Sequence, residues 1–176
     1  MRILASILFF IILFINISSK VVLSHGPTRQ KVKISVTIKA KPEDVWNVIK
    51  DFEKINNWHP SISKVESDGK IRTIFYSPRN NTPITQKLES HSNEKMMYKT
   101  SISEVDIKFF PVNTYTANIS VKGNDDGSST VLWKAAFYRA FLNNDPPPEL
   151  NEAAAIKAVT EFFEAGLNNL KSKLEK

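Results

Sequence analysis

Hydrophobic and polar residues alternate along the stretch 31–40, KVKISVTIKA. Val32, Ile34, Val36 and Ile38 fall on one side of an extended chain, and the residues between them are polar or charged. A period of two is the pattern of a strand with one buried face. We therefore expect the first strand of a half-buried sheet here.

The pattern changes after residue 40 to the spacing of a helix. In 41–52, KPEDVWNVIKDF, Pro42 stands at a first-turn position, acidic residues follow it, and the apolar residues recur near helical spacing. A second short helical stretch, EKINNW, ends at Pro60, because proline cannot continue a helix. Two short helices are thus predicted after the first strand.

Six further stretches have the composition of strands and are grouped in pairs. Asp68-Gly69 is a strong signal for a tight hairpin, and short polar connections join the other two pairs. The predicted strands are 61–67 with 70–76, 84–91 with 95–104, and 113–123 with 129–141. Consecutive hairpins produce an antiparallel sheet.

The C-terminal part of the chain predicts one long helix. The proline-rich segment 143–150 precedes it, and we expect that segment to be a stiff rim because each proline fixes its φ angle. An apolar stripe at helical spacing follows, formed by Ile156, Val159, Phe163, Leu167, Leu170 and Leu174. Gly166 costs helix stability, which suggests a close approach to the sheet. The fold class predicted is α+β, with a curved seven-stranded antiparallel sheet wrapped around the last helix.

The N-terminal residues have the features of an export signal. Arg2 precedes an apolar run at 3–17, and small residues suited to cleavage follow. We expect residues 1–24 to be a signal peptide cut before His25, residues 25–176 to form a single domain, and the protein to be periplasmic or secreted. The alternative is an uncleaved membrane anchor, although the run is shorter than the ~20 residues of a comfortable span.

Composition narrows the classes of function. Residues 1–24 hold Arg2 and Lys20 and no acid, so 22 basic and 18 acidic residues lie in 25–176, a net charge of +4. The charges are interspersed, which argues against a nucleic-acid partner. There is no cysteine, so disulfides and thiolate metal sites are excluded. The motifs of hydrolases, kinases and zinc enzymes are absent. We expect no metal and no cofactor; copper chelation by an exposed His25 lacks a convincing second histidine.

Specific stretches resemble the START-like, Bet v 1-like superfamily, in its polyketide cyclase/dehydrase branch. These are KPEDVWNVIKDFEKINNWHPSISKVE at 41–66 and VLWKAAFY at 131–138. Within that branch the chain is most similar to periplasmic methanol-oxidation accessory proteins of the MxaD type. HGPTRQKV at 25–32, FPVNTYTANISVK at 110–122 and, above all, the block at 143–174 carry this similarity.

The resemblance implies a helix-grip fold, in which the sheet and the long helix enclose a cavity. Members bind lipids, aromatic polyketides or hormones there, and a minority catalyse cyclisation or dehydration. Proteins of the MxaD type are helpers of methanol dehydrogenase and its cytochrome acceptor. Many relatives carry a glutamate where this chain has Gln86, and the loss of that acid disfavours an enzyme.

Trp58-His59-Pro60 is the most conspicuous candidate motif. In the structural interpretation Pro60 ends the helix, Trp58 packs beneath it, and His59 is partly exposed. In the functional interpretations Trp58 and His59 line the rim of the cavity, or His59 acts as an acid–base catalyst, since histidine titrates near neutral pH. We expect an architectural corner in which Trp58 forms one wall of the cavity.

Other candidates lie on strands. Either Lys70, Arg72 and Ile74 or Ile71, Thr73 and Phe75 face the interior. The resemblance favours an inward Arg72 that holds a carboxylate, and the alternative is a solvated surface arginine. The expected ligand-binding set comprises Trp58, His59, Arg72, Tyr98, Tyr115 and Trp133.

Three hypotheses about function follow. The favoured one is a non-enzymatic accessory or ligand-binding protein whose partners are a small hydrophobic ligand or a periplasmic dehydrogenase or cytochrome. The second is a cyclase- or dehydratase-like enzyme that uses His59 and Arg72 on an apolar or aromatic substrate. The third is a lipid carrier. None involves nucleic acid or stable membrane association after signal cleavage.

Overall fold

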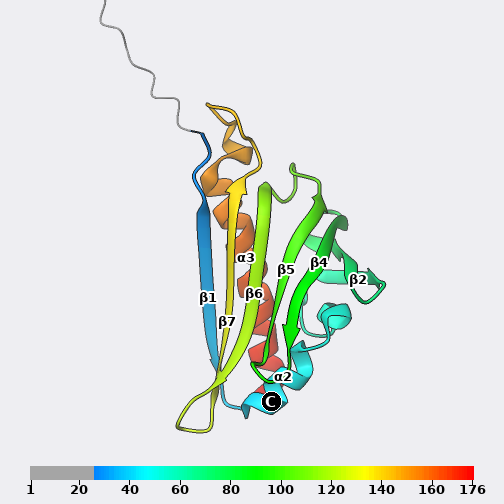
Figure 1. Ribbon diagram of the computed structural model, residues 1–176, viewed down its shortest axis with the longest axis vertical. Helices are drawn as coiled ribbons and strands as arrows, with labels where there is room; N and C mark the ends of the chain where they lie inside the picture. Colours follow the sequence, from blue (N-terminus) through cyan, green and yellow to red (C-terminus); the bar gives the residue numbers. More distant parts are fainter. Residues whose placement is uncertain (1–25) are drawn as a thin grey trace, which may run out of the picture.

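The computed structural model describes residues 26–176, so the predicted signal peptide and His25 lie outside the described residues. Figure 1 shows the order of the elements along the chain. They are β1 (Gln30–Ile38), α2 (Pro42–Ile49), the 3-10 helix η1 (Phe52–Asn57), β2 (Ile62–Ser67), β3 (Ile71–Tyr76), η2 (Ser77–Arg79), β4 (Thr82–Ser92), β5 (Met97–Val105), β6 (Val112–Gly123), β7 (Ser129–Arg139), η3 (Pro148–Leu150) and α3 (Glu152–Leu174).

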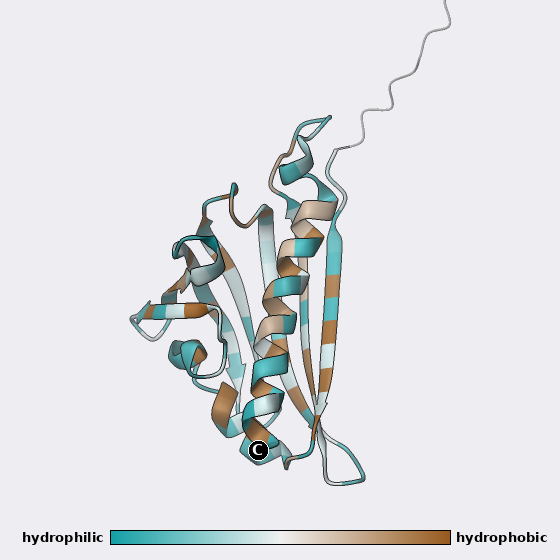
Figure 2. Cartoon of the chain, turned by 180° about the vertical axis from the view of Figure 1, so that it is seen from behind, coloured by the Kyte–Doolittle hydropathy of each residue, from teal (hydrophilic) through white to brown (hydrophobic). Residues whose placement is uncertain are grey.

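The seven strands form one sheet in the order β1-β7-β6-β5-β4-β3-β2, and every neighbouring pair is antiparallel. The first strand therefore lies beside the last one, while the others follow the hairpin order. Helix α3 runs along one face of the sheet, behind it in Figure 1 and in front of it in Figure 2. The predicted α+β fold, with its antiparallel sheet and long C-terminal helix, is confirmed.

Helix α3 begins where Asn151 caps it, with the Asn151 side chain accepting a hydrogen bond of 2.9 Å from the amide of Ala154. Its buried face consists of Ala155, Ala158, Val159, Phe162, Phe163, Gly166, Leu167 and Leu170. The predicted stripe was wrong at its first residue. Ile156 is 36% exposed, because the buried face turns toward Ala155 and Phe162 instead.

Gly166 lies at a close approach between α3 and the residues that it covers. A Cβ atom added there would stand 2.7 Å from Cδ2 of His59 and 3.0 Å from Cζ3 of Trp133. Only glycine fits at such a separation without displacement of its neighbours. The close approach expected from the sequence is confirmed.

Several predicted boundaries were wrong by a few residues. The helix expected over 41–52 ends at Ile49, and Phe52 already belongs to η1. Strand β5 starts at Met97 rather than at 95, because Met96 turns the chain with a φ of 45°. Within residues 26–176, no helix combines the length and the apolar character needed to cross a membrane.

Candidate functional site

Trp58 and His59 form a fully buried corner between η1 and β2, and each is 0% exposed. The expectation that His59 is partly exposed was therefore wrong. His59 Nε2 lies 2.8 Å from the carbonyl oxygen of Phe162 on α3, and its Nδ1 accepts a hydrogen bond of 3.3 Å from the amide of Ser61. These partners fit a neutral ring with its proton on Nε2.

The surroundings of His59 oppose its protonation. The pKa of His59 is lowered to about 4, chiefly by burial and also by the nearby charge of Arg72, while the hydrogen bond to Phe162 opposes both effects. At neutral pH the imidazole is uncharged and both of its nitrogens are engaged with the backbone. It has no free lone pair to act as a general base.

The corner is fastened to α3 and packed against β7. Asn169 donates a hydrogen bond of 3.0 Å to the carbonyl of Trp58, and the Trp58 ring lies 5.5 Å from that of Trp133. Trp133 in turn stacks on Phe163 at 4.2 Å, with 10° between the ring planes. Trp58, His59 and Trp133, together with the phenylalanines of α3, thus form a packed cluster, which we call the aromatic corner.

Arg72 occupies a different part of the interior. Arg72 is 2% exposed and faces inward together with Ile74. This is the first of the two strand orientations that the sequence allowed. The Nε and Nη2 atoms of Arg72 donate hydrogen bonds of 2.9 and 2.7 Å to Oε1 of Gln86 on β4, and Nη1 donates to the carbonyl of Phe52. The guanidinium also lies 4.2 Å from the centre of the Phe52 ring.

No carboxylate among the described residues forms an ion pair with Arg72. Its electrostatic neighbours are the buried hydroxyls of Tyr98 and Tyr115. Burial lowers the pKa of Arg72 and raises the pKa of both tyrosines, while the guanidinium charge limits the rise. The Tyr98 hydroxyl makes no well-directed hydrogen bond in the described part of the chain. We call Arg72, Gln86, Tyr98 and Tyr115 the arginine cluster.

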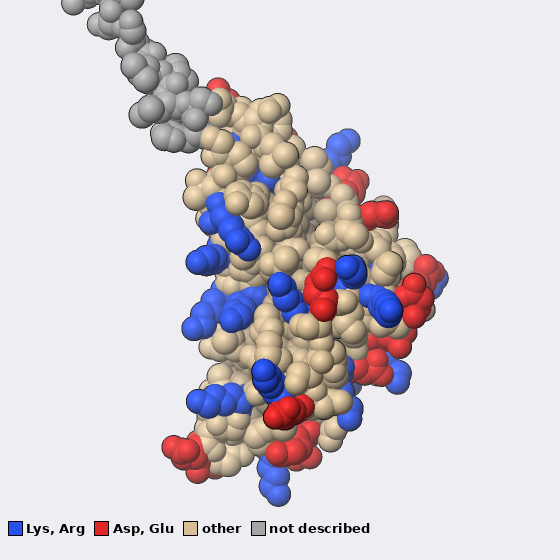
Figure 3. All heavy atoms as spheres, in the orientation of Figure 1, with Lys and Arg blue, Asp and Glu red and all other residues tan. Residues whose placement is uncertain are grey.

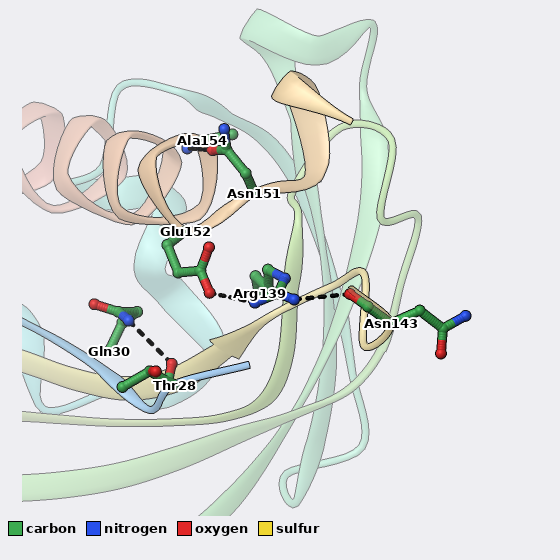
Figure 4. A network of polar contacts seen from close by, with 7 residues as sticks. All are labelled: Thr28, Gln30, Arg139, Asn143, Asn151, Glu152 and Ala154. Carbon is green, nitrogen blue, oxygen red and sulfur yellow. Dashed lines mark hydrogen bonds and ion pairs between the residues drawn. The ribbon is translucent and has the colours of Figure 1, made fainter. Parts of the chain in front are cut away.

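A second buried arginine provides a contrast (Figure 4). Arg139, at the end of β7, is 3% exposed and forms an ion pair with Glu152 at the start of α3. It also donates a hydrogen bond of 2.8 Å to the carbonyl of Asn143. Among residues 26–176, Arg139 thus has an acidic partner and Arg72 has none.

An open hollow lies beside the arginine cluster, in a fork between β5 and β6. The two strands pair only as far as Ser101 opposite Thr116, and beyond that point β5 continues along β4 while β6 continues along β7. Figure 1 shows the gap widening toward the loop that joins them. The hollow has a volume of about 350 Å³ and is lined by residues 102–105, Ile107 and residues 112–115.

The backbone of the fork has an unusual conformation. Thr114 has a φ of 47°, a left-handed value that is rare for a β-branched residue, and the pairing of β6 with β7 is irregular between Asn113 and Thr116. Thr114 and Tyr115 lie within this irregular stretch, and both line the hollow. Sequence reasoning missed the fork, because neither a bulge nor a left-handed threonine leaves a signature in the residue pattern.

The six predicted site residues thus fall into separate groups. Trp58, His59 and Trp133 belong to the aromatic corner, and Arg72 and Tyr98 belong to the arginine cluster. Tyr115 joins the arginine cluster to the fork, since its side chain is buried beside Arg72 and its residue lines the hollow. Within residues 26–176, no three metal-ligating side chains come close enough together to hold a metal ion.

Comparison with known proteins places the chain among helix-grip proteins. Residues 29–175 match the family model described as polyketide cyclase / dehydrase and lipid transport. No curated protein sequence matches the chain. A solved structure of the protein XoxI from Bacillus cereus is 26% identical, with a TM-score of 0.70, over 82% of this chain and 94% of that one.

Two more distant structures share the fold. A START superfamily protein from Mycobacterium smegmatis is 14% identical, with a TM-score of 0.62, over 82% of this chain and 97% of that one. Norcoclaurine synthase from Thalictrum flavum, in complex with dopamine and hydroxybenzaldehyde, is 16% identical, with a TM-score of 0.62 and coverages of 84% and 87%.

Proposed function

Because the chain belongs to the polyketide cyclase / dehydrase and lipid transport family, we propose that it binds a small apolar molecule that carries an acidic group. The observation behind this proposal is the buried guanidinium of Arg72, which has only neutral partners. In this proposal the acidic group of the ligand meets Arg72, and the protein acts as a binding or accessory protein rather than as an enzyme.

The electrostatics of Arg72 support an anionic ligand. A charge removed from water is costly unless an opposite charge and hydrogen bonds replace the lost solvation. Three of the five N–H donors of the guanidinium are used by Gln86 and Phe52, and the hydroxyl of Tyr98 interacts with the guanidinium as well. In our proposal a ligand takes the remaining two donors. A carboxylate accepts such a pair of donors in a bidentate arrangement.

The fork supplies a route toward this charge. Its volume of about 350 Å³ is within the range of small-molecule sites, and it opens next to Tyr115. In our proposal the apolar part of the ligand rests on Ile102 and Val112 in the fork. Its acidic group passes Tyr115 toward Arg72, and the hydroxyl of Tyr98 becomes an additional donor.

The chemistry of the neighbouring groups favours binding over catalysis. His59 is neutral and has both ring nitrogens engaged with the backbone. Gln86, which contacts Arg72, carries an amide that neither accepts nor releases a proton. The arginine cluster therefore lacks a side chain suited to general acid–base catalysis near neutral pH.

A titration with a pair of matched probes tests the proposal. Amide shifts in residues 102–105 and 112–115 are followed by NMR while phenylbutyrate, or the uncharged phenylbutanol, is added. We expect phenylbutyrate to bind more tightly, and Arg72→Met to weaken its binding about tenfold or more, as for a lost charge-assisted hydrogen bond. Arg79→Met removes an exposed arginine and serves as the control. Equal binding of both probes, unchanged by Arg72→Met, would disprove the proposal.

We further propose an export destination and a helper role in methanol oxidation. The apolar run at 3–17 supports export, and the residues at 143–174 that resemble MxaD-type proteins support assistance to a periplasmic methanol dehydrogenase and its cytochrome. Fractionation of cells that express the full chain tests the first point. Electron transfer from a purified dehydrogenase to its cytochrome, with and without this protein, tests the second; an unchanged rate contradicts it.

A lipid carrier is the second candidate, supported by exposed apolar side chains at one end of the molecule. Ile107 and Phe109 lie in the β5–β6 connection and Leu142 in the segment after β7, at the same end of the sheet (Figure 1). Phe109 also lines a hollow of about 160 Å³ with Lys157 of α3. Transfer of a fluorescent fatty acid between vesicles, slowed by Phe109→Asp, is the expected result for a carrier.

A further inference from the structure

A lysine-lined hollow covers the outer face of the sheet, opposite α3. It spans β1, β7, β6 and β5 and has a volume of about 510 Å³. Figure 3 shows this face, with blue basic side chains over the part of the sheet that holds β1, β7 and β6. Four lysines line it, together with Val32, three alanines, Thr116 and Asn118, and the lining has no acidic residue; the lysines are Lys31, Lys33, Lys99 and Lys134. We call these four residues the lysine face.

The strand register places three of the lysines in one row. Lys33 lies directly opposite Lys134, Lys134 opposite Asn118, and Asn118 opposite Lys99. Since neighbouring strands are about 4.8 Å apart, the row is roughly 14 Å long. Like charges directly opposite each other in an antiparallel pair destabilise the sheet. The pairing of Lys33 with Lys134 therefore opposes folding, and an anionic partner would relieve it.

The lysine face has no ion-pair partner within residues 26–176. Glu89, on the neighbouring strand β4, is already engaged by the hydroxyl of Ser101 and by Lys87, and the charge of Lys99 joins them in lowering the pKa of Glu89. The charge of the lysine face is thus directed to the solvent.

We propose that the lysine face docks a partner protein through a row of carboxylates on the partner's surface. Lysines are hydrated point charges that suit carboxylates across a wet interface, and they contribute association rate and orientation. The polar residues between them, Thr116 and Asn118, provide hydrogen-bonding groups. This surface is independent of the ligand proposed at Arg72, since the two lie on opposite faces of the sheet.

Other anionic partners fit less well. The exposed large apolar side chains of the described chain are Ile71, Ile107, Phe109, Leu142 and Ile156, and none of them lines the lysine face. A membrane-inserting surface combines basic residues with such side chains. A small phosphate-like anion favours arginine forks and oriented backbone amides. The lining contains no arginine.

The test uses a poly-L-glutamate peptide as the probe and NMR amide shifts as the measurement. We expect shifts centred on Lys33, Lys99 and Lys134 that weaken as salt is added, because salt screens exposed charges. The triple variant Lys33→Gln, Lys99→Gln, Lys134→Gln should raise the dissociation constant about tenfold or more. The control variant Lys54→Gln, Lys64→Gln, Lys157→Gln has the same net charge and should bind as the unmodified protein does.

Three outcomes would overturn the proposal. The first is an equal loss of peptide binding in the control variant, which would show that net charge alone drives binding. The second is that the triple variant weakens binding to anionic phosphatidylglycerol vesicles more than binding to the peptide. The third is that pyrophosphate, but not the peptide, saturates the shifts of the same amides. Arg72→Met separates this proposal from the ligand proposal. It should leave peptide binding unchanged, even if it abolishes the binding of phenylbutyrate.

Discussion

The aromatic corner and the arginine cluster are two buried regions on the same side of the sheet. Their titratable side chains, His59 and Arg72, differ in charge and in the partners that they have. In the aromatic corner, His59 is uncharged and both ring nitrogens have backbone partners. In the arginine cluster, Arg72 is charged and its bonded partners are neutral. A satisfied neutral group suits a structural role, whereas a buried charge without a counter-ion is the observation behind the proposed ligand site.

Trp58→Ala is expected to have the largest effect, because it empties the aromatic corner. Trp58 is fully buried and packs against Trp133. Loss of such a ring should lower the free energy of unfolding by about 3–5 kcal/mol. Chemical denaturation measures this value, and binding of phenylbutyrate by the fraction that remains folded should be retained. Loss of binding with little loss of stability would reverse the roles assigned to the two regions.

The pH dependence of stability should carry the signature of His59. The pKa of His59 is about 4 in the folded protein against 6.5 for an unperturbed histidine, so the unfolded chain takes up a proton at a higher pH than the folded protein does. The contribution of neutral His59 to the free energy of unfolding is complete above about pH 6.5 and is lost as the pH falls toward 4. The total loss is about 3 kcal/mol.

Denaturation curves across this pH range, for the unmodified protein and for His59→Gln, check the assignment. Glutamine keeps a donor for the carbonyl of Phe162 and does not titrate. We expect the variant to be less stable at pH 7. Its free energy of unfolding should also change much less between pH 6.5 and pH 4 than that of the unmodified protein. If the pH dependence of stability were the same in the variant, groups other than His59 would be responsible for it.

Gly166→Ala tests the contact between α3 and the aromatic corner. Alanine favours a helix by about 1 kcal/mol over glycine, so the change should stabilise a helix that had free space. Here the new Cβ would lie 2.7 Å from the His59 ring. We expect a net destabilisation of about 1–3 kcal/mol, as for an overpacked core. Asn168→Ala, at an exposed position of the same helix, is the control and should not destabilise the protein.

Arg72→Met should have the smallest effect on stability, although it is as deeply buried as the residues of the aromatic corner. The change removes the cost of burying a charge without a counter-ion, and this gain offsets the loss of the hydrogen bonds to Gln86 and Phe52. We expect a change in unfolding free energy within about 1 kcal/mol. Arg139→Met, which breaks the ion pair with Glu152, is the comparison and should cost more. Equal costs for both variants would show that Arg72 is structural.

The hydrophobic pattern predicted the sheet and α3, because both depend on local periodicity. The orientation of Arg72 stayed open, since Ile71 and Phe75 offered an equally apolar face to the interior. The burial of His59 was missed because it depends on Gly166, far along the chain, which allows α3 to approach. The fork was missed for a similar reason: the register between β5 and β6 is a long-range property that residue types do not encode.

The attachment of α3 to the rest of the molecule has a consequence for the order of folding. The side chain of Glu175 accepts a hydrogen bond from the amide of Lys39, 136 residues earlier, and Asn169 reaches Trp58 across 111 residues. Within residues 26–176, strand β1 pairs with β7 alone. Contacts of such long range slow folding, because the intervening chain must first be gathered. A nascent chain therefore cannot complete its fold before α3 has left the ribosome. A truncation within α3 should leave the protein incompletely folded.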